Sequence, residues 1–576
     1  MLLSAAVTLP TLAIRPMPKV WTVKQSDSTS IKILVQGEGG RGIYYTSLDG
    51  KIIVKGENND FYYAVIRDGE LKPSAFIAHE AGDRTAEEKA FLAETKTEKN
   101  LHLVKVAPKH ISHKAPTRVI SASTVDGLGE YNKSGMGGIQ SIGKPLVPVV
   151  MVEFTDKSFL STTTKEKMTR YYNEKGYSDE THCVGSVKDF FESQSRGMFV
   201  PTFEVIGPIN VDHSYAYYGK DEKTAELVRD VVKKAKAQNI SFDKFKHPST
   251  GNVELICLFY AGRGQATENP NDPLYENYIW PQEQDIDENI QGTTFNSFFV
   301  GNELNYYGKL MGMGVFCHEL GHALGLPDFY NTSQFVTLPR DPFSYWSIMD
   351  AGPYVNEANA PIGYTAYERS YLGWLKIKEL TGPETVTLDP VSNRNGQLAA
   401  IVRSPRNRSE YFILENRSSD TWYPKEYKER RGSGYETNTF GDGLMLSHYA
   451  YEKGIWEYNS VNTVANKMRA YMIPADNEKL SYSAHKENLY GVNKKSIDKL
   501  TFYDGVSISN AVQGIEIKAD GTITFGYRQQ PNGIENINEA TAENAGDGNY
   551  YDLQGRRVLN PTRGIYIHNG KKIVVK

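Results

Sequence analysis

Cysteine is scarce in this chain. Cys183, Cys257 and Cys317 are the only three among 576 residues, and no two form a C-x-x-C pair. This number excludes a disulfide framework and a zinc site built from paired thiolates. No cysteine occurs in residues 1–145, so this part of the chain offers no thiolate. The fold must therefore depend on hydrophobic cores, with metals as the remaining source of support.

Long apolar runs and an excess of charge of one sign are also lacking. No stretch reaches the roughly 20 apolar residues that span a bilayer, so we expect no membrane span. The chain has 65 Lys and Arg against 69 Asp and Glu, a net charge of −4, which gives no electrostatic reason to expect a nucleic acid as partner. The composition says nothing about the oligomeric state.

The first residues are small and apolar. Residues 1–13 resemble the apolar core and cleavage site of a signal peptide whose basic start is missing, with Thr11-Leu12-Ala13 as the cleavage triplet. We therefore interpret residues 1–13 as a truncated signal peptide. On this interpretation the protein is exported, and is either secreted or attached to the cell surface.

The length predicts several domains, because domains usually hold about 100 to 200 residues. Residues 14–145 are predicted to be a β-rich module and a linker. Its strands flank turns such as Asp49-Gly50, a charged helix covers 85–99, and the tether at 106–145 offers Lys114 and Arg118 to proteases. The fold class expected for the whole chain is multidomain α+β.

Three further regions follow. Residues 146–376 combine apolar strands, such as 146–154 and 253–260, with helical patterns, which predicts an α/β domain. Short strands separated by turns predict a β-sandwich over 377–528. Residues 529–576 form a Gln, Asn and Gly-rich spacer and a small β tail.

The segment Met311 to Gly325 contains His-Glu-Leu-Gly-His at positions 318–322. Apolar residues, Cys317 among them, share one stripe at helical spacing, so we expect Cys317 to be a core residue and not a ligand. His318 and His322 lie one turn apart on the opposite side and can bind one Zn²⁺ ion. Glu319 is then placed to act as general base toward the water that zinc activates.

A third zinc ligand is expected, because catalytic zinc sites use three protein ligands and a water. Gly325 can adopt the left-handed conformation that ends a helix, and Pro327 prevents the helix from resuming, so the chain can return Asp328 to the metal. The alternative is Glu368, from a later helical segment. Asp328 is the favoured ligand, and Glu368 remains open.

Three other features have possible roles near such a site. Met349, in Ser347-Ile348-Met349-Asp350, could form a methionine turn beneath the metal, with a structural role. Tyr354 and His448 are candidates for stabilising an oxyanion. Residues 268–272 could bind Ca²⁺ through oxygen ligands, but they lack the EF-hand spacing, and a solvated loop is the default.

These residues resemble the immune inhibitor A family of secreted bacterial zinc metalloproteases, which are metzincin-like. The family signature resembles His-Glu-x-Gly-His-x-x-Gly-Leu-Pro-Asp followed by Tyr-Trp-Ser-x-Met, which here are residues 318–328 and 345–349. Family-like stretches also occur at 189–197, 261–265 and 371–374. The resemblance covers roughly residues 18 to 475.

The resemblance implies a zincin catalytic domain at 146–376, an inhibitory propeptide before it and a β-sandwich after it. It also implies that His318, His322 and Asp328 bind zinc, that Glu319 is the base, and that the protein is a zymogen. The last 30 or so residues resemble the C-terminal sorting tails of exported Bacteroidetes proteins, which are often linked to type IX secretion.

The sequence therefore predicts a zinc metalloendopeptidase that hydrolyses extracellular or host proteins or glycoproteins, inhibited by its own propeptide. One alternative is a surface adhesion or binding protein with a vestigial zinc site. The intact Glu319 argues against it. Another alternative is a narrow peptidase for glycoproteins such as mucin.

Overall fold

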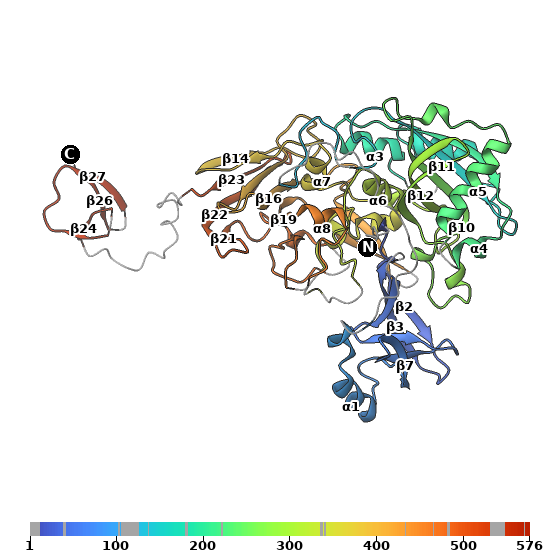
Figure 1. Ribbon diagram of the computed structural model, residues 1–576. Helices are drawn as coiled ribbons and strands as arrows, with labels where there is room; N and C mark the ends of the chain where they lie inside the picture. Colours follow the sequence, from blue (N-terminus) through green and yellow to red (C-terminus); the bar gives the residue numbers. More distant parts are fainter. Residues whose placement is uncertain are drawn as a thin grey trace, which may run out of the picture.

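The chain forms a strand-rich α+β structure with several distinct sheets (Figure 1). The computed structural model describes residues 12–38, 42–101, 104, 126–135, 137–178, 183–220, 223–333, 338, 341–431, 434–464, 466–480, 484–529, 548–553, 555–569 and 571–575. Among these residues, no helix is both long and apolar enough to cross a bilayer. Most of the predicted signal peptide lies outside the described residues, and Leu12 and Ala13 form the short strand β1.

The N-terminal module is an antiparallel meander. Its six strands follow one another in the sheet in sequence order: β2 (Trp21–Lys24), β3 (Ser30–Glu38), β4 (Gly42–Ser47), β5 (Ile52–Lys55), β6 (Phe61–Arg67) and β7 (Glu70–Ile77). Along β2, buried and exposed residues alternate, as expected of a sheet with one covered face. Helix α1 (Ala86–Thr95) starts with a capping box between Thr85 and Glu88.

The α/β domain is built on a mostly parallel sheet, ordered β1-β11-β12-β10-β8-β9. Four strands are parallel: β8 (Leu146–Glu153), β9 (Thr202–Asn210), β10 (Val253–Arg263) and β12 (Thr293–Leu304). Strand β11 (Gln282–Ile290) runs antiparallel to β12, and the two-residue β1 pairs antiparallel to β11. An N-terminal segment thus completes the sheet at its antiparallel edge.

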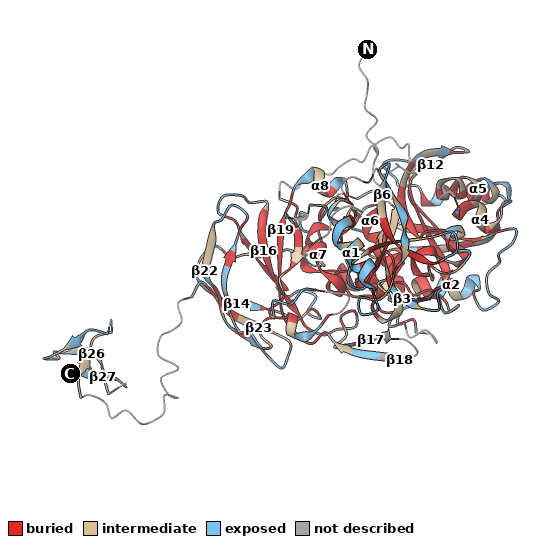
Figure 2. Cartoon of the chain, turned by 90° about the horizontal axis from the view of Figure 1, so that it is seen from below, coloured by how far each residue is buried: buried red, intermediate tan, exposed pale blue. Residues whose placement is uncertain are grey.

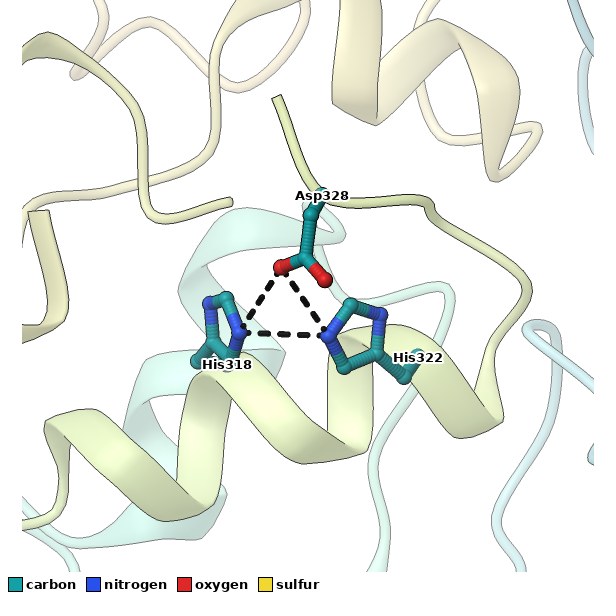
Figure 3. Close-up of side chains that lie close together, drawn as sticks. All are labelled: His318, His322 and Asp328. Carbon is teal, nitrogen blue, oxygen red and sulfur yellow. Dashed lines mark hydrogen bonds and ion pairs between the residues drawn. The ribbon is translucent and has the colours of Figure 1, made fainter. Parts of the chain in front are cut away.

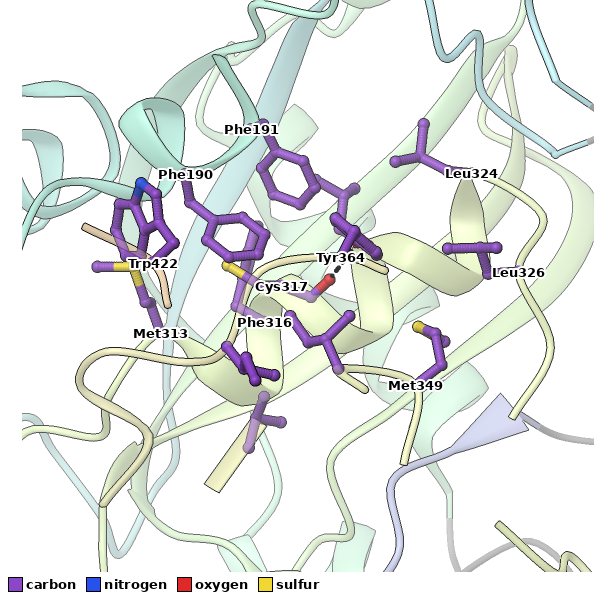
Figure 4. Close-up of a cluster of buried hydrophobic side chains, with 14 of the residues drawn as sticks. Phe190, Phe191, Met313, Phe316, Cys317, Leu324, Leu326, Met349, Tyr364 and Trp422 are labelled. Atoms are coloured by element: carbon purple, nitrogen blue, oxygen red, sulfur yellow. Dashed lines mark hydrogen bonds between the residues drawn. The ribbon is translucent and has the colours of Figure 1, made fainter. Parts of the chain in front are cut away.

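Helices cover both faces of this sheet. Alternate residues of β8 enter different cores, because successive side chains of a strand point to opposite faces: Val149 packs with one core and Val150 with the other. The second core contains α5 (Thr224–Ala237), with the short α4 (Tyr215–Gly219) beside it. The first contains α2 (Lys165–Asn173), α3 (Val187–Gln194) and α6 (Gly314–Ala323). Figure 4 shows Phe190 and Phe191 of α3 beside Cys317 of α6.

Residues 126–145, assigned to the tether in the sequence analysis, pack against the α/β domain. The N–H groups of Gly129 and Asn132 donate to the carbonyls of Ser370 and Gly373. The N–H of Ile139 donates to the carbonyl of Ala323, at the end of α6. The earlier part of the predicted tether, residues 105–125, lies outside the described residues.

The domain after the α/β domain has two sheets. One is ordered β13-β15-β16-β19-β20 and the other β14-β23-β22-β21. The first comprises β13 (Lys378–Glu379), β15 (Ala399–Arg403), β16 (Glu410–Arg417), β19 (Gly443–Ala450) and β20 (Ala470–Met472). The second comprises β14 (Glu384–Leu388), β21 (Ile497–Thr501), β22 (Ser507–Ile517) and β23 (Ile523–Tyr527). The facing sides of the two sheets share a core, as in a β-sandwich.

The two domains also share a core, because strand β16 is buried on both faces. Phe412 and Leu414 pack between the sheets of the sandwich, whereas Ile413 packs into the core that holds α6 and the short helix α7 (Ala366–Tyr371). In Figure 2 the buried residues extend from β16 and β19 through α7 to α6. A hairpin, β17 (Glu426–Arg431) and β18 (Gly434–Thr439), and the short helix α8 (Lys453–Glu457) complete the domain. The α/β domain and the sandwich are therefore one packed body.

The C-terminal tail is a separate small sheet. It is ordered β25-β24-β26-β27 and comprises β24 (Tyr550–Tyr551), β25 (Arg557–Val558), β26 (Gly564–His568) and β27 (Lys571–Val575). Asn569, between β26 and β27, has a φ of 48°, a conformation that asparagine tolerates well. The tail lies apart from the rest of the chain in both views (Figures 1 and 2).

Candidate metal centre

The motif helix α6 presents two imidazoles to one point. Nε2 of His318 and Nε2 of His322 are 3.1 Å apart. Oδ1 of Asp328 is 3.2 Å from the first of these nitrogens and 3.3 Å from the second. The three atoms form a nearly equilateral triangle above the helix (Figure 3), so the structure brings together the three ligands that the sequence analysis favoured.

The other nitrogen of each imidazole has a backbone partner. Nδ1 of His318 is 2.7 Å from the carbonyl oxygen of Ile348, and Nδ1 of His322 is 2.8 Å from that of Leu326. A carbonyl oxygen can only accept, so Nδ1 must be the protonated nitrogen in each ring, which leaves the lone pair of Nε2 for a metal. The backbone thus sets both the orientation and the tautomer of the two histidines.

Asp328 reaches the histidines because the helix ends as the sequence predicts. Gly325 has a φ of 107°, and the N–H of Leu326 donates to the carbonyl of Gly321. The chain then turns back. The carboxylate of Asp328 is held by Asn459, whose Nδ2 donates to Oδ2 at 2.7 Å and whose Oδ1 accepts the N–H of Asp328 at 2.7 Å. Asn459 belongs to the sandwich domain, and the sequence analysis missed it.

The geometry fits a tetrahedral zinc ion. Metal–ligand distances of about 2.0 to 2.2 Å place the ligand atoms of a tetrahedron about 3.3 Å apart, close to the 3.1 to 3.3 Å found here. Oδ1 of Asp328 is buried and makes no conventional hydrogen bond with any described residue. Two neutral imidazoles and one carboxylate are also a known ligand set for this metal.

Burial and mutual charge shift the pKa values of the three groups. Burial lowers the pKa of His318. The same burial opposes protonation of His322, yet the adjacent Asp328 raises the pKa of His322 to about 9, so that a proton competes with a metal ion for Nε2. Burial disfavours the charged form of Asp328 as well, but the two imidazoles hold its pKa below the usual value. The carboxylate is thus ionised, and it attracts positive charge to this point.

Glu319 follows the first histidine and has both oxygens occupied. Oε1 accepts the N–H of Ile14 at 2.9 Å, and Oε2 accepts the N–H of Glu283 on β11 at 2.8 Å. The side chain is fully buried, and burial raises its pKa well above the usual value. The residue expected to act as general base therefore lies between the edge strand and an N-terminal segment.

Met349 lies directly under the motif helix. Gly321 leaves the room for it, because a Cβ at Gly321 would lie 2.9 Å from Sδ of Met349 and 2.9 Å from the hydroxyl of Tyr364. The preceding residue, Ile348, supplies the carbonyl that orients His318. Met349 is fully buried and lies beside the helix in Figure 4. This placement is that of a turn that supports the ligands.

Glu368 does not join the three ligands. Its carboxylate accepts the hydroxyl of Ser347 and the N–H of Thr365, both at 2.5 Å, and the bond with Thr365 belongs to the capping box of α7. The spacing Thr365-x-x-Glu368 is a sequence signature of such a cap and could have identified this role. Glu368 also stabilises the turn that contains Met349, because the hydroxyl oxygen of Ser347 accepts the N–H of Met349.

Of the two oxyanion candidates, Tyr354 lies near the site and His448 does not. The hydroxyl of Tyr354 donates to the carbonyl of Arg15 at 2.6 Å, close to the site. His448 lies in the sandwich, stacked on Phe412 and 3.1 Å from Glu410. In the loop 268–272, Glu268 pairs with Arg263 at 3.0 Å, and this loop is absent from the possible metal clusters of the described residues. Cys317 is a buried, unbridged core residue, as expected.

An N-terminal segment covers the site. Leu12 and Ala13 pair with Glu283 and Gln282 of β11. The carbonyl of Ile14 accepts the indole N–H of Trp280 at 3.0 Å, and the N–H of Met17 donates to the carbonyl of Ala266 at 2.8 Å. His318, Glu319, His322 and Asp328 are each 0% exposed. The metal centre is therefore closed from solvent.

Comparisons with known proteins agree with the predicted resemblance. Residues 146–376 match the family model described as immune inhibitor A peptidase M6, catalytic domain. The chain is 25% identical over 301 residues to the pre-pro-metalloprotease PrtV of Vibrio cholerae serotype O1, in each of two strains; the match covers 43% of this chain and 32% of the relative. It is 24% identical over 432 residues to immune inhibitor A of Bacillus thuringiensis subsp. alesti, covering 62% of this chain and 60% of that protein.

The chain thus spans about a third of the length of the PrtV relatives and about three fifths of the other. The matched region corresponds to the α/β domain that contains the metal centre. The family model and the names of these relatives favour a metalloprotease function for the matched region.

Proposed function

We propose that this protein is a zinc-dependent endopeptidase, exported as a zymogen, in which Glu319 acts as general base. The observation that carries the proposal is the convergence of Nε2 of His318, Nε2 of His322 and Oδ1 of Asp328 within 3.3 Å of one another. Glu319 belongs to the same helix and borders the same closed site. Zinc, when bound by these three groups, supplies Lewis acidity that activates water and polarises a carbonyl group.

The chain's own residues then have separate tasks. Glu319 holds the attacking water and accepts its proton, since its two oxygens already accept two N–H groups at this place. The hydroxyl of Tyr354 donates to a peptide carbonyl here, that of Arg15, so it is suited to stabilise the oxyanion that forms from a substrate carbonyl. Met349 and Ile348 support the ligands from below.

Strand β11, which becomes the edge of the sheet when β1 leaves, binds the substrate backbone. Strand β1 adds to it antiparallel, by backbone hydrogen bonds that depend little on side chains. An extended segment of a protein or glycoprotein substrate can bind in the same way. A cavity of about 180 Å³ adjoins Tyr354. Its lining also includes Met17, Lys19, Tyr306 and Tyr345.

The N-terminal module acts as the inhibitor. The segment that starts at Ile14 contacts Glu319 and Tyr354, so a substrate cannot reach the proposed base. Two contacts anchor the module nearby: Nζ of Lys19 lies 4.1 Å from the ring centroid of Trp21 and 3.9 Å from that of Tyr306, and the ammonium of Lys55 donates to the carbonyl of Pro270 at 3.0 Å. Activation then requires release of this module, and residues 105–125 are the segment to cut.

Chelation tests the proposal. The chain is nicked within residues 105–125, separated from the module and incubated with casein and with a mucin. The proposal expects cleavage that stops with 1,10-phenanthroline and returns with added zinc. Cleavage of mucin but not of casein would indicate a narrow glycoprotein peptidase. If neither protein is cut while zinc is bound, the peptidase proposal is wrong and an adhesion role is favoured.

A further inference from the structure

The buried side chain next to Ile14 lies in an acidic pocket. The guanidinium of Arg15 is 2.7 Å from Oδ1 of Asp350, and the two side chains are 8% and 0% exposed. The guanidinium carbon also lies 5.4 Å from the ring centroid of Tyr330. Arg15 of the N-terminal segment is therefore buried against Asp350, the residue after Met349.

The carboxylate of Asp350 is also held by groups other than Arg15. The second oxygen of Asp350 accepts the N–H groups of Phe343 at 2.9 Å and Ser344 at 2.8 Å. These two bonds fix the carboxylate, with Oδ1 directed at the guanidinium. Asp341 is near enough that the charges of Arg15 and Asp350 both affect its ionisation. The carboxylate of Asp350 thus faces the guanidinium directly, and Asp341 adds a longer-range charge effect.

Arg15 occupies this pocket in the manner of a substrate. The N–H of Ile14 contacts Glu319, and the carbonyl of Arg15 accepts the hydroxyl of Tyr354. The same short segment thus contacts the general base, the oxyanion candidate and the acidic pocket. Pro16 follows Arg15 and favours an extended backbone at Arg15, which suits a strand laid along the cleft.

Removal of the segment changes the energetics of the pocket. A carboxylate as deeply buried as Asp350 is costly without a cation, since the loss of one partner of a buried pair leaves an uncompensated charge. An incoming substrate with an arginine or lysine at the corresponding position replaces the lost partner. A neutral side chain cannot.

From these contacts we propose that Asp350, assisted by Asp341, forms a specificity pocket that selects arginine or lysine within one residue of the scissile bond. The inference rests on the proposed peptidase function and names its substrate class. Arginine is preferred to lysine, because its planar fork can engage a fixed carboxylate with two donors. Asp350 acts through substrate binding, so a change there alters selectivity more than the chemical step.

The test uses the nicked chain freed of its module, in which the packed body of residues 126–529 stays intact. Wild type and Asp350→Asn are given a proteome-derived peptide library, and the cleavage sites are read by mass spectrometry. Asparagine still offers an oxygen to the N–H groups of Phe343 and Ser344. Asp504→Asn is the matched control, because Asp504 is exposed and accepts the N–H of Val506 at 2.9 Å. Melting temperatures confirm that all three proteins are folded.

A second arm measures binding with a peptide of residues 12–17 that carries either arginine or citrulline, its neutral isostere. We expect wild type and Asp504→Asn to enrich arginine and lysine at one fixed position, and the arginine peptide to inhibit them roughly 30-fold or more better than the citrulline peptide. Asp350→Asn should lose both preferences while still cutting casein.

The two proposals fail in different ways. Casein cleavage without any basic preference, together with equal inhibition by both peptides, would overturn the specificity pocket and leave the peptidase intact. An absence of all cleavage with zinc bound would overturn the peptidase function, and the pocket proposal with it.

Discussion

The backbone N–H of Ile14 donates a 2.9 Å hydrogen bond to Oε1 of Glu319, 305 positions further along the chain. Glu319 is the proposed general base, and its other oxygen accepts the N–H of Glu283 on β11. A backbone N–H of the chain itself therefore occupies the proposed base. Four side chains of the metal centre are closed from solvent in the same arrangement.

Arg15 should contribute strongly to this closed state. Arg15→Glu in the unprocessed chain places a second negative charge against Asp350, so the N-terminal segment should dissociate from the site more often. We expect casein cleavage by the unprocessed protein to rise about tenfold or more, as expected when one partner of a buried ion pair is lost. Lys24→Glu is the control, because Lys24 is an exposed residue of the same module. Equal activity of the two variants would contradict the role of Arg15 in latency.

Asn459 should strengthen metal binding from the sandwich domain. Asn459→Gly removes both hydrogen bonds to Asp328 and keeps a residue that tolerates the φ of 49° found there. Outer hydrogen-bond partners of metal ligands typically affect affinity by about 10- to 100-fold, so we expect a loss of zinc affinity in that range. Competition with a chromophoric chelator measures it. Asn477→Gly, at an exposed position with a φ of 59°, should leave the affinity unchanged.

Gly321 should be needed for the turn under the motif helix. A methyl group there meets Met349 and Tyr364 at 2.9 Å, so Gly321→Ala should destabilise the fold by about 1 to 3 kcal/mol, the usual cost of overpacking a core. Thermal unfolding measures the change. Gly454→Ala, in helix α8, has nothing within 4 Å of the new methyl group and should be neutral or slightly stabilising. The account of this turn is wrong if both variants behave alike.

The preference for basic side chains should depend on pH. Burial raises the pKa of Asp341 to about 6, against the opposing charge of Arg15 and with the support of Asp350. A carboxyl group with this pKa is charged above pH 6 and neutral below it, so the attraction for arginine should weaken as the pH falls through about 6. Paired arginine and citrulline substrates, compared from pH 5 to 8, measure the effect. In Asp341→Asn the ratio should be flatter with pH; an unchanged profile would exclude Asp341 as its source.

The sequence predicted those parts of the site whose residues are close together in the chain. His318, Glu319, His322 and Asp328 lie within eleven positions, and helix geometry together with a glycine stop is sufficient to bring the ligands to one point. Met349 follows soon after. The strands of the three β-rich regions were also predictable, because alternation and turn residues are local signals.

Contacts between distant segments were not predictable in the same way. Asn459 is 131 positions from Asp328, and Arg15 is 335 positions from Asp350. Neither pair has a local pattern, and each depends on how whole domains pack. The assignment of residues 126–145 to a tether has a similar origin, because the stretch is rich in glycine. The glycines allow close backbone contacts with the ends of α6 and α7. Glu368 is different, since its capping box was visible in the sequence.

The most direct measurement compares zinc content and protein cleavage for wild type and Glu319→Gln, both nicked in the tether and freed of the module. The account predicts about one zinc per chain in each protein, as three ligands and one water imply. Wild type should cut casein or mucin, and the variant should be slower by about 100-fold or more, the usual contribution of a general base. Equal cleavage rates in the two proteins, or no cleavage by the zinc-loaded wild type, would contradict it.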